Sequence, residues 1–81
     1  MTNITLYDAT INKKYTIENV LLEDILLRRL EALGINEGTL IEVITKKSHG
    51  AMVVKVRGTR LALGKHITQN IEIREEVVHN D

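Results

Sequence analysis

The sequence contains no cysteine, and this absence removes several classes of chemistry. Disulfide bonds, thiolate metal sites and thiol nucleophiles all need cysteine, so none of them is possible here. Phenylalanine and tryptophan are also missing, which leaves Tyr7 and Tyr15 as the aromatic stacking residues. Small barrels that bind single-stranded nucleic acid or proline-rich peptides use aromatic platforms, so the composition argues against both functions.

Long apolar runs are missing as well. No run approaches the ~20 apolar residues that a membrane-spanning helix needs. Residues 1–4 have neither the basic nor the apolar region of a secretory signal. We therefore expect a cytoplasmic protein whose 81 residues form a single domain over residues 1–75 with a flexible polar tail over 76–81.

The net charge is zero, but the charges are segregated along the chain. No acidic residue lies between Glu42 and Glu72, whereas six cations do: Lys46, Lys47, Lys55, Arg57, Arg60 and Lys65. This pattern predicts a basic surface that could face an acidic protein, a membrane or phosphates, or could simply be solvated. Because stacking residues are scarce, we expect no specific nucleic-acid binding.

Most of the chain alternates apolar and polar residues with the period of a β-strand. Gly58 is predicted to be the first central residue of a type II′ turn, because that position needs a positive φ. Residues 64–69 are expected to form a helical turn or bend. The predicted strands lie at 4–7, 15–18, 40–47, 51–57, 61–63 and 71–73.

Residues 20–33 instead have apolar residues at helical spacing. Asn19 is the expected N-cap, and Gly34 the expected left-handed residue after the helix. Leu21 and Leu27 fall outside the predicted buried face, beside Arg28. The predicted buried face consists of Leu22, Ile25, Leu26, Leu30 and Leu33.

These elements predict a mainly β fold. Two short strands, one helix, a three-stranded meander and a final strand cannot bury both faces of an open sheet. We expect a small, SH3-like, partly open barrel of five to six strands with one α-helix.

The sequence offers no convincing catalytic or metal-binding constellation. Ser48 and His49 could be paired as nucleophile and base, but they occupy a hairpin tip that would not orient them. His49, His66 and His79 have no partner at helical spacing, and we expect them to be exposed. We therefore predict no enzyme activity, no cofactor and no metal site in the isolated chain, while a weak site shared with a partner stays open.

Three segments resemble the FeoA family. Residues 29–35 (Arg-Leu-Glu-Ala-Leu-Gly-Ile), followed by Gly38 and 41–43, resemble its helix-to-strand segment. Residues 52–63 resemble its central hairpin, and 71–73 its closing strand. The resemblance implies an SH3-like domain that assists or regulates a FeoB-type ferrous iron permease from the cytoplasm, without a catalytic residue. Transition-metal binding is also attributed to the family through its kinship with iron-dependent repressors.

The expected partner is the cytosolic GTP-binding domain of that permease, through which alone the protein would be peripheral to the membrane. The alternative is a nucleic-acid-binding or metal-sensing module like the accessory domain of the repressors. The residues predicted to bind the partner are Leu21, Leu27, Arg28, Lys55, Arg57 and Arg60.

Overall fold

The computed structural model describes residues 4–76, whose strands form one antiparallel sheet. The six strands lie in the order β1-β6-β2-β3-β4-β5, and the two edge strands do not pair with each other. This confirms the predicted mainly β, SH3-like, partly open barrel. The strands are β1 (Ile4–Thr5), β2 (Lys14–Val20), β3 (Leu40–Lys46), β4 (Met52–Val56), β5 (Thr59–Leu63) and β6 (Ile71–Glu75).

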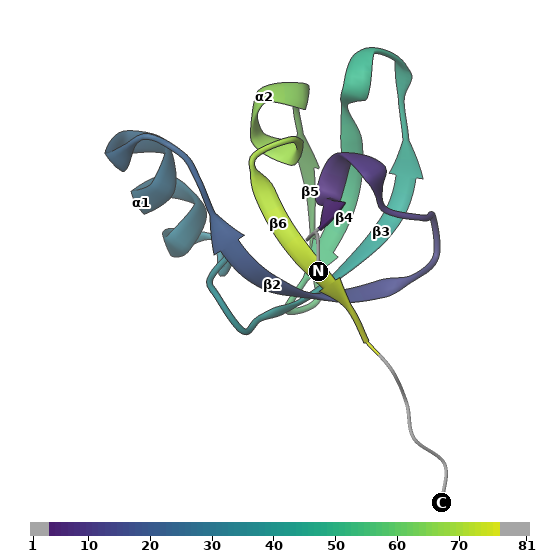
Figure 1. Ribbon diagram of the computed structural model, residues 1–81, viewed down its shortest axis with the longest axis horizontal. Coiled ribbons are helices and arrows are strands. Elements are labelled where there is room, and N and C mark those ends of the chain that lie inside the picture. Colours follow the sequence, from purple (N-terminus) through teal and green to yellow (C-terminus); the bar gives the residue numbers. More distant parts are fainter. Residues whose placement is uncertain (1–3, 77–81) are drawn as a thin grey trace, which may run out of the picture.

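Short helical elements complete the fold. The main helix is α1 (Asp24–Ala32), and α2 (Lys65–Thr68) is the helical turn expected at 64–69. The 3-10 turns η1 (Leu6–Asp8) and η2 (Ser48–Gly50) follow β1 and β3. The sheet is strongly curved, with α1 to one side and with α2 and the β3–β4 loop at the same end of the molecule (Figure 1).

The core is formed by the inward-facing side chains of the curved sheet together with a few residues from α1 and the loops. On β4, Met52, Val54 and Val56 all point inward, at most 2 % exposed, which confirms the predicted alternation. The remaining buried apolar residues are Leu6, Ala9, Tyr15, Ile17, Leu30, Ile35, Ile41, Val43, Leu63, Ile71 and Ile73.

Two local predictions about strands and turns are wrong. The strand expected at 4–7 ends at Thr5, because η1 turns Leu6 into the core. Val56 pairs with Thr59, so the loop between β4 and β5 is Arg57-Gly58. Both loop residues have positive φ, 51° and 82°. This is a type I′ turn with glycine second, whereas the prediction was type II′ with glycine first.

The helix also differs from its prediction at its start. It begins at Asp24 after Glu23, because residues up to Val20 pair with β6 as part of β2. Asn19 is therefore not the N-cap, and its side-chain amide donates to Glu72 at 3.0 Å.

The buried face of α1 also differs from the predicted one. Leu30 is the one buried residue of the helix, and Leu26 and Leu27 are both half-buried. Ile25 and Leu33 are exposed, at 73 % and 50 %. The prediction that Leu27 points away from the domain is therefore wrong. Leu22 packs against the core from the segment before the helix. It therefore does not belong to the buried face of α1, contrary to the prediction.

The end of α1 agrees with its prediction. Gly34 has a φ of 96°, and its N–H donates to the carbonyl of Glu31 at 3.0 Å. The N–H of Ile35 donates to the carbonyl of Leu30 at 2.9 Å, and both side chains are buried. This pair of bonds is a Schellman motif, in which a left-handed residue satisfies the last carbonyls of the helix.

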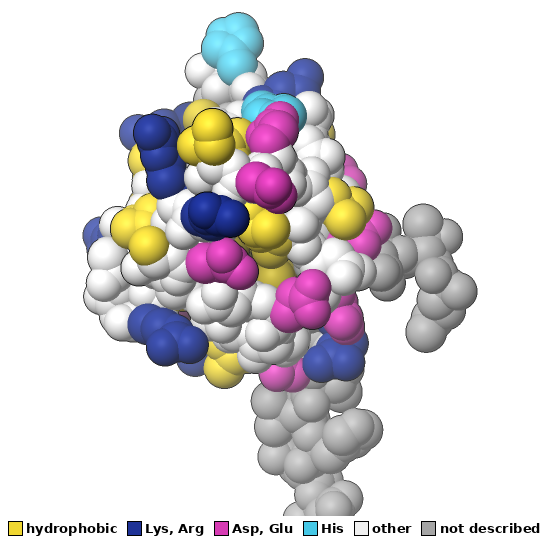
Figure 2. Space-filling model, turned by 90° about the vertical axis from the view of Figure 1, so that its left-hand side faces the viewer, with side chains coloured by type: hydrophobic (Ala, Val, Ile, Leu, Met, Phe, Trp, Pro, Cys, Tyr) yellow, Lys and Arg dark blue, Asp and Glu magenta, His cyan; other side chains and the backbone are white. Residues whose placement is uncertain are grey.

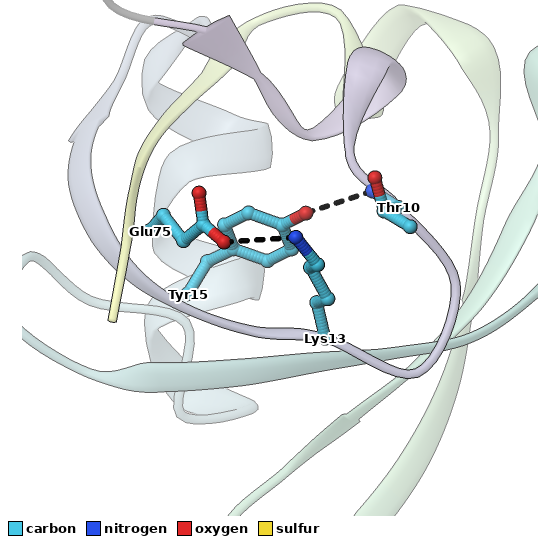
Figure 3. Close-up of polar contacts among 4 residues, drawn as sticks. All are labelled: Thr10, Lys13, Tyr15 and Glu75. Carbon is cyan, nitrogen blue, oxygen red and sulfur yellow. Dashed lines mark hydrogen bonds and ion pairs between the residues drawn. The ribbon is translucent and has the colours of Figure 1, made fainter. Parts of the chain in front are cut away.

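The segment before β2 is held in place by polar contacts (Figure 3). The hydroxyl of Tyr15, a buried residue, accepts a hydrogen bond from the backbone N–H of Thr10 at 2.8 Å. Lys13 Nζ contacts Glu75 Oε1 at 2.9 Å, and this hydrogen-bonded carboxylate raises the pKa of Lys13. At the end of the described chain, Glu76 accepts a hydrogen bond from Thr16 at 2.8 Å, and the rest of the predicted tail lies outside the described residues.

The two tyrosines give a matched test of the hydrogen bond between Tyr15 and Thr10. Tyr15→Phe removes the acceptor of the Thr10 N–H and should lower the free energy of unfolding by about 1 kcal/mol. Tyr7→Phe keeps the exposed ring and should change it by less than about 0.5 kcal/mol. Chemical denaturation of both variants measures the difference, and equal effects would contradict the assigned hydrogen bond.

Candidate functional site: a hollow at the end of the sheet

A hollow of about 740 Å³ lies where β2 begins, β3 begins and β4 ends. We call it the sheet-end hollow. Its lining residues are Lys14, Glu37, Gly38, Thr39, Leu40, Ile41, Glu42, Lys55, Arg57 and Gly58.

Strand register places the charges of this region in one row. Lys14 on β2 is opposite Glu42 on β3, and Glu42 is opposite Lys55 on β4. Lys55 is in turn opposite Arg60 on β5. Directly opposed residues point to the same face of a sheet, so the four side chains share the outer face. The row therefore reads basic, acidic, basic, basic.

The charged groups lining the hollow are available to a partner. Three cations and two acids line it: Lys14, Lys55, Arg57, Glu37 and Glu42. Within residues 4–76, none of these five forms an ion pair shorter than 4 Å. Leu40 is 51 % exposed and adds an apolar side chain. The hollow thus combines an exposed apolar group with charges that have no direct partner in the described chain.

Arg57 links the hollow to the end of α1. Its Cδ lies 3.1 Å from the point where a Cβ on Gly34 would be. The side chain of Arg57 can pass this close to Gly34 because glycine has no Cβ.

A second hollow, of about 350 Å³, lies beside the first. Both are lined by Glu37, and the second is also lined by Leu27 and Glu31 of α1 and by the core residue Ile35. Leu27 therefore lies beside the charged hollow, although its side chain is half-buried. The two hollows share one lining residue, Glu37, so they adjoin each other.

The structure brings together only some of the residues predicted to bind a partner. Lys55 and Arg57 line the sheet-end hollow, Arg60 pairs with Lys55, and Leu27 lines the neighbouring hollow. Leu21 is 59 % exposed but lies beside α2, where its N–H donates to Asn70. Arg28 is exposed on α1 and lines neither hollow.

Sequence reasoning missed Lys14, Glu37, Leu40 and Glu42. Leu40 could have been found, because it is out of phase with the inward-facing Ile41 and Val43 and must point outward. Lys14 and Glu42 enter the site through the pairing of β2 with β3, which has no local signal in the sequence.

The described histidines do not converge. His49 and His66 are exposed, as predicted, and His79 lies outside the described residues. His66 Nε2 lies 3.0 Å from Glu23 Oε1, and the pKa of Glu23 is lowered by its own backbone N–H and then by His66. Over residues 4–76, no three His, Asp or Glu side chains are grouped so that they could hold a metal ion.

The α1 side of the surface shows apolar groups among charges of both signs (Figure 2).

Comparison with known proteins establishes the family. The family model described as the FeoA domain matches residues 4–75. This chain belongs to the FeoA family. A search of curated proteins finds no match. No helix in the described part of this FeoA chain is both long enough and apolar enough to cross a membrane.

Solved structures share the fold. An FeoA-like protein from Clostridium acetobutylicum is 26 % identical with a TM-score of 0.79, over 100 % of this chain and 96 % of that one. An iron uptake regulatory protein (FeoA) is 22 % identical with a TM-score of 0.81, over 94 % and 100 %. A manganese-dependent transcriptional repressor is 18 % identical with a TM-score of 0.82, over 94 % of this chain but 44 % of the repressor. The likeness to the repressor shows a shared fold alone.

Gly34 ends α1 in a left-handed conformation, and the same substitution at a second glycine provides a control for testing this cap. Gly34→Ser should lower the free energy of unfolding by roughly 1–2 kcal/mol, because a left-handed conformation is costly for any residue with a Cβ. Gly64 has a φ of −82° at the N-cap of α2 and has open space around it. Gly64→Ser should therefore be neutral or slightly stabilising. Chemical denaturation compares them, and a neutral Gly34→Ser would refute the assigned cap.

Proposed function

We propose that this protein is a non-catalytic accessory protein of ferrous iron uptake. It acts in the cytoplasm by docking its sheet-end hollow on the cytosolic GTP-binding domain of a FeoB-type iron permease. The observation that carries the proposal is the hollow itself, in which the exposed Leu40 is surrounded by charges without ion-pair partners in the described chain.

The composition of the hollow suits a reversible protein contact. Interfaces that form and dissociate have an apolar centre and a polar, solvent-accessible rim. Leu40 supplies the first, and Lys14, Lys55, Arg57, Glu37 and Glu42 supply the second. Because rim charges fix register and accelerate encounter more than they add affinity, the mixed signs favour one orientation of the partner.

The identity of the partner rests on the family. The FeoA model spans nearly all described residues, and one solved relative is named as an iron uptake regulatory protein. An accessory domain of ferrous iron uptake has the iron permease as its natural target. The alternative, a metal-sensing or nucleic-acid-binding module, is supported only by the shared fold of the repressor, so we do not propose it.

Removing cations from the hollow should weaken docking without unfolding the domain. Asn is favoured at the first position of a type I′ turn, so Arg57→Asn suits the φ of 51° while removing the charge. Lys55 is exposed, so Lys55→Gln is tolerated. We expect the double variant to keep its thermal stability and to bind the permease's cytosolic domain about tenfold more weakly. Calorimetry with and without guanine nucleotide measures this.

Two further variants complete the design. Arg29→Gln removes one positive charge on α1, outside both hollows, and should bind normally. Arg28→Gln tests the helix surface predicted from the sequence. If Arg28→Gln weakens binding while the double variant does not, the docking surface is on α1 and the sheet-end hollow is excluded.

A further inference from the structure

A second charged surface lies at the opposite end of β4 from Arg57 and Gly58. Its four basic residues, Lys46, Lys47, His49 and Lys65, are all exposed. We call these four residues and Tyr7 the basic tip. A hollow of about 450 Å³ is lined by Tyr7, Lys46, Lys47 and His49 but not by Lys65, and Asp8 is its single acidic lining residue. The tip belongs to neither hollow of the candidate site.

The basic tip is held in place by packing. Gly50 has a φ of 81°, and a Cβ on it would lie 2.7 Å from Tyr7 Cε1 and from Lys65 Cγ. The carbonyl of Gly50 accepts a hydrogen bond at 3.1 Å from the hydroxyl of Thr68, which is fully buried. The β3–β4 loop is thereby fixed against η1 and α2, beside which it lies in Figure 1.

Two of the three lysines are also held by contacts of their own. Lys46 Nζ donates to the carbonyl of Tyr7 at 3.2 Å, and Lys65 Nζ lies 5.8 Å from the centre of the Tyr7 ring. His49 is at the loop apex in a left-handed conformation, with a φ of 62°. Groups that are already ordered lose less conformational freedom when they bind a ligand, so the tip is preorganised for an anion.

The surroundings of the tip indicate which anion it takes. Among the exposed large apolar side chains of the described chain, only Tyr7 belongs to the tip, and Lys65 lies over its ring. The tip therefore has no cluster of apolar anchors such as a protein-binding hot spot uses. One face of the Tyr7 ring carries Lys65, so that face is not open for stacking with a nucleic-acid base. A cluster of point charges without an anchor is suited to a diffuse surface of phosphates.

We propose that the basic tip binds the phosphate headgroups of an anionic lipid bilayer. The sequence predicts membrane association through the permease alone, and this contact would be direct. Because the five residues of β4 span roughly 17 Å at about 3.3 Å per residue, the tip and the sheet-end hollow can be occupied together. Binding of the tip does not require the permease, so it is tested separately from the proposed function.

The test is co-sedimentation of the full chain with vesicles of phosphatidylcholine alone or mixed with phosphatidylglycerol. Lys47 is exposed and makes no side-chain hydrogen bond or ion pair within residues 4–76, so its substitution should leave the fold intact. Each cation near an anionic surface contributes about fivefold in affinity. Lys47→Gln should weaken binding to the mixed vesicles about fivefold, and Lys47→Glu about 25-fold. Arg29→Gln on α1 should bind as the unsubstituted protein does.

The proposal also requires no binding to pure phosphatidylcholine and weaker binding to mixed vesicles at high salt, because salt screens exposed charges. Equal binding to both vesicle types, or an equal loss with Arg29→Gln, would overturn it. Tighter Lys47-dependent binding to polyuridylate or to polyglutamate than to the vesicles would assign the tip to nucleic acid or to an acidic protein instead. Circular dichroism confirms that each variant is folded.

Discussion

The pairing of β4 with both of its neighbours holds the core and the charged surfaces of the domain in register. Met52, Val54 and Val56 fill the core from this strand, and Lys55 is left on the outer face between Glu42 and Arg60. A slip of one residue would turn Lys55 inward and three apolar side chains outward, so the core fixes the register. The same register defines both ends of the strand, where the sheet-end hollow and the basic tip are built. Both proposed surfaces thus follow from the burial of one strand.

The helix completes the surface that the strands begin. Leu30 and Ile35 anchor the end of α1 in the core, and Gly34 between them reverses the chain without a side chain. The side chain of Arg57, at the β4–β5 turn, packs close to Gly34 at the end of the helix. A docking partner would therefore contact elements that the core holds rigidly together. Such a surface needs little reorganisation to bind, which is favourable for a domain as small as this one.

Much of the fold could be predicted from local pattern, and the errors have a common cause. Local sequence determines the alternation on β4, the cap at Gly34 and the order of the elements. The start of α1, by contrast, depends on how far β2 pairs with β6, and the turn at Arg57-Gly58 depends on which residues of β4 and β5 are opposed. The candidate site divides in the same way. Lys55 and Arg57 stand out in the sequence as unbalanced cations, whereas Lys14 and Glu42 join them only through pairing of distant strands.

Docking of the sheet-end hollow on the cytosolic domain of the iron permease can be observed residue by residue. The isotope-labelled protein is titrated with that domain, and its amide chemical shifts are followed in NMR spectra. We expect the largest shifts at Leu40, Lys55, Arg57 and Gly58, which line the hollow. Shifts confined to the exposed residues Ile25 and Arg28 of α1, or no shifts in a large excess of the permease domain, would exclude docking through the hollow.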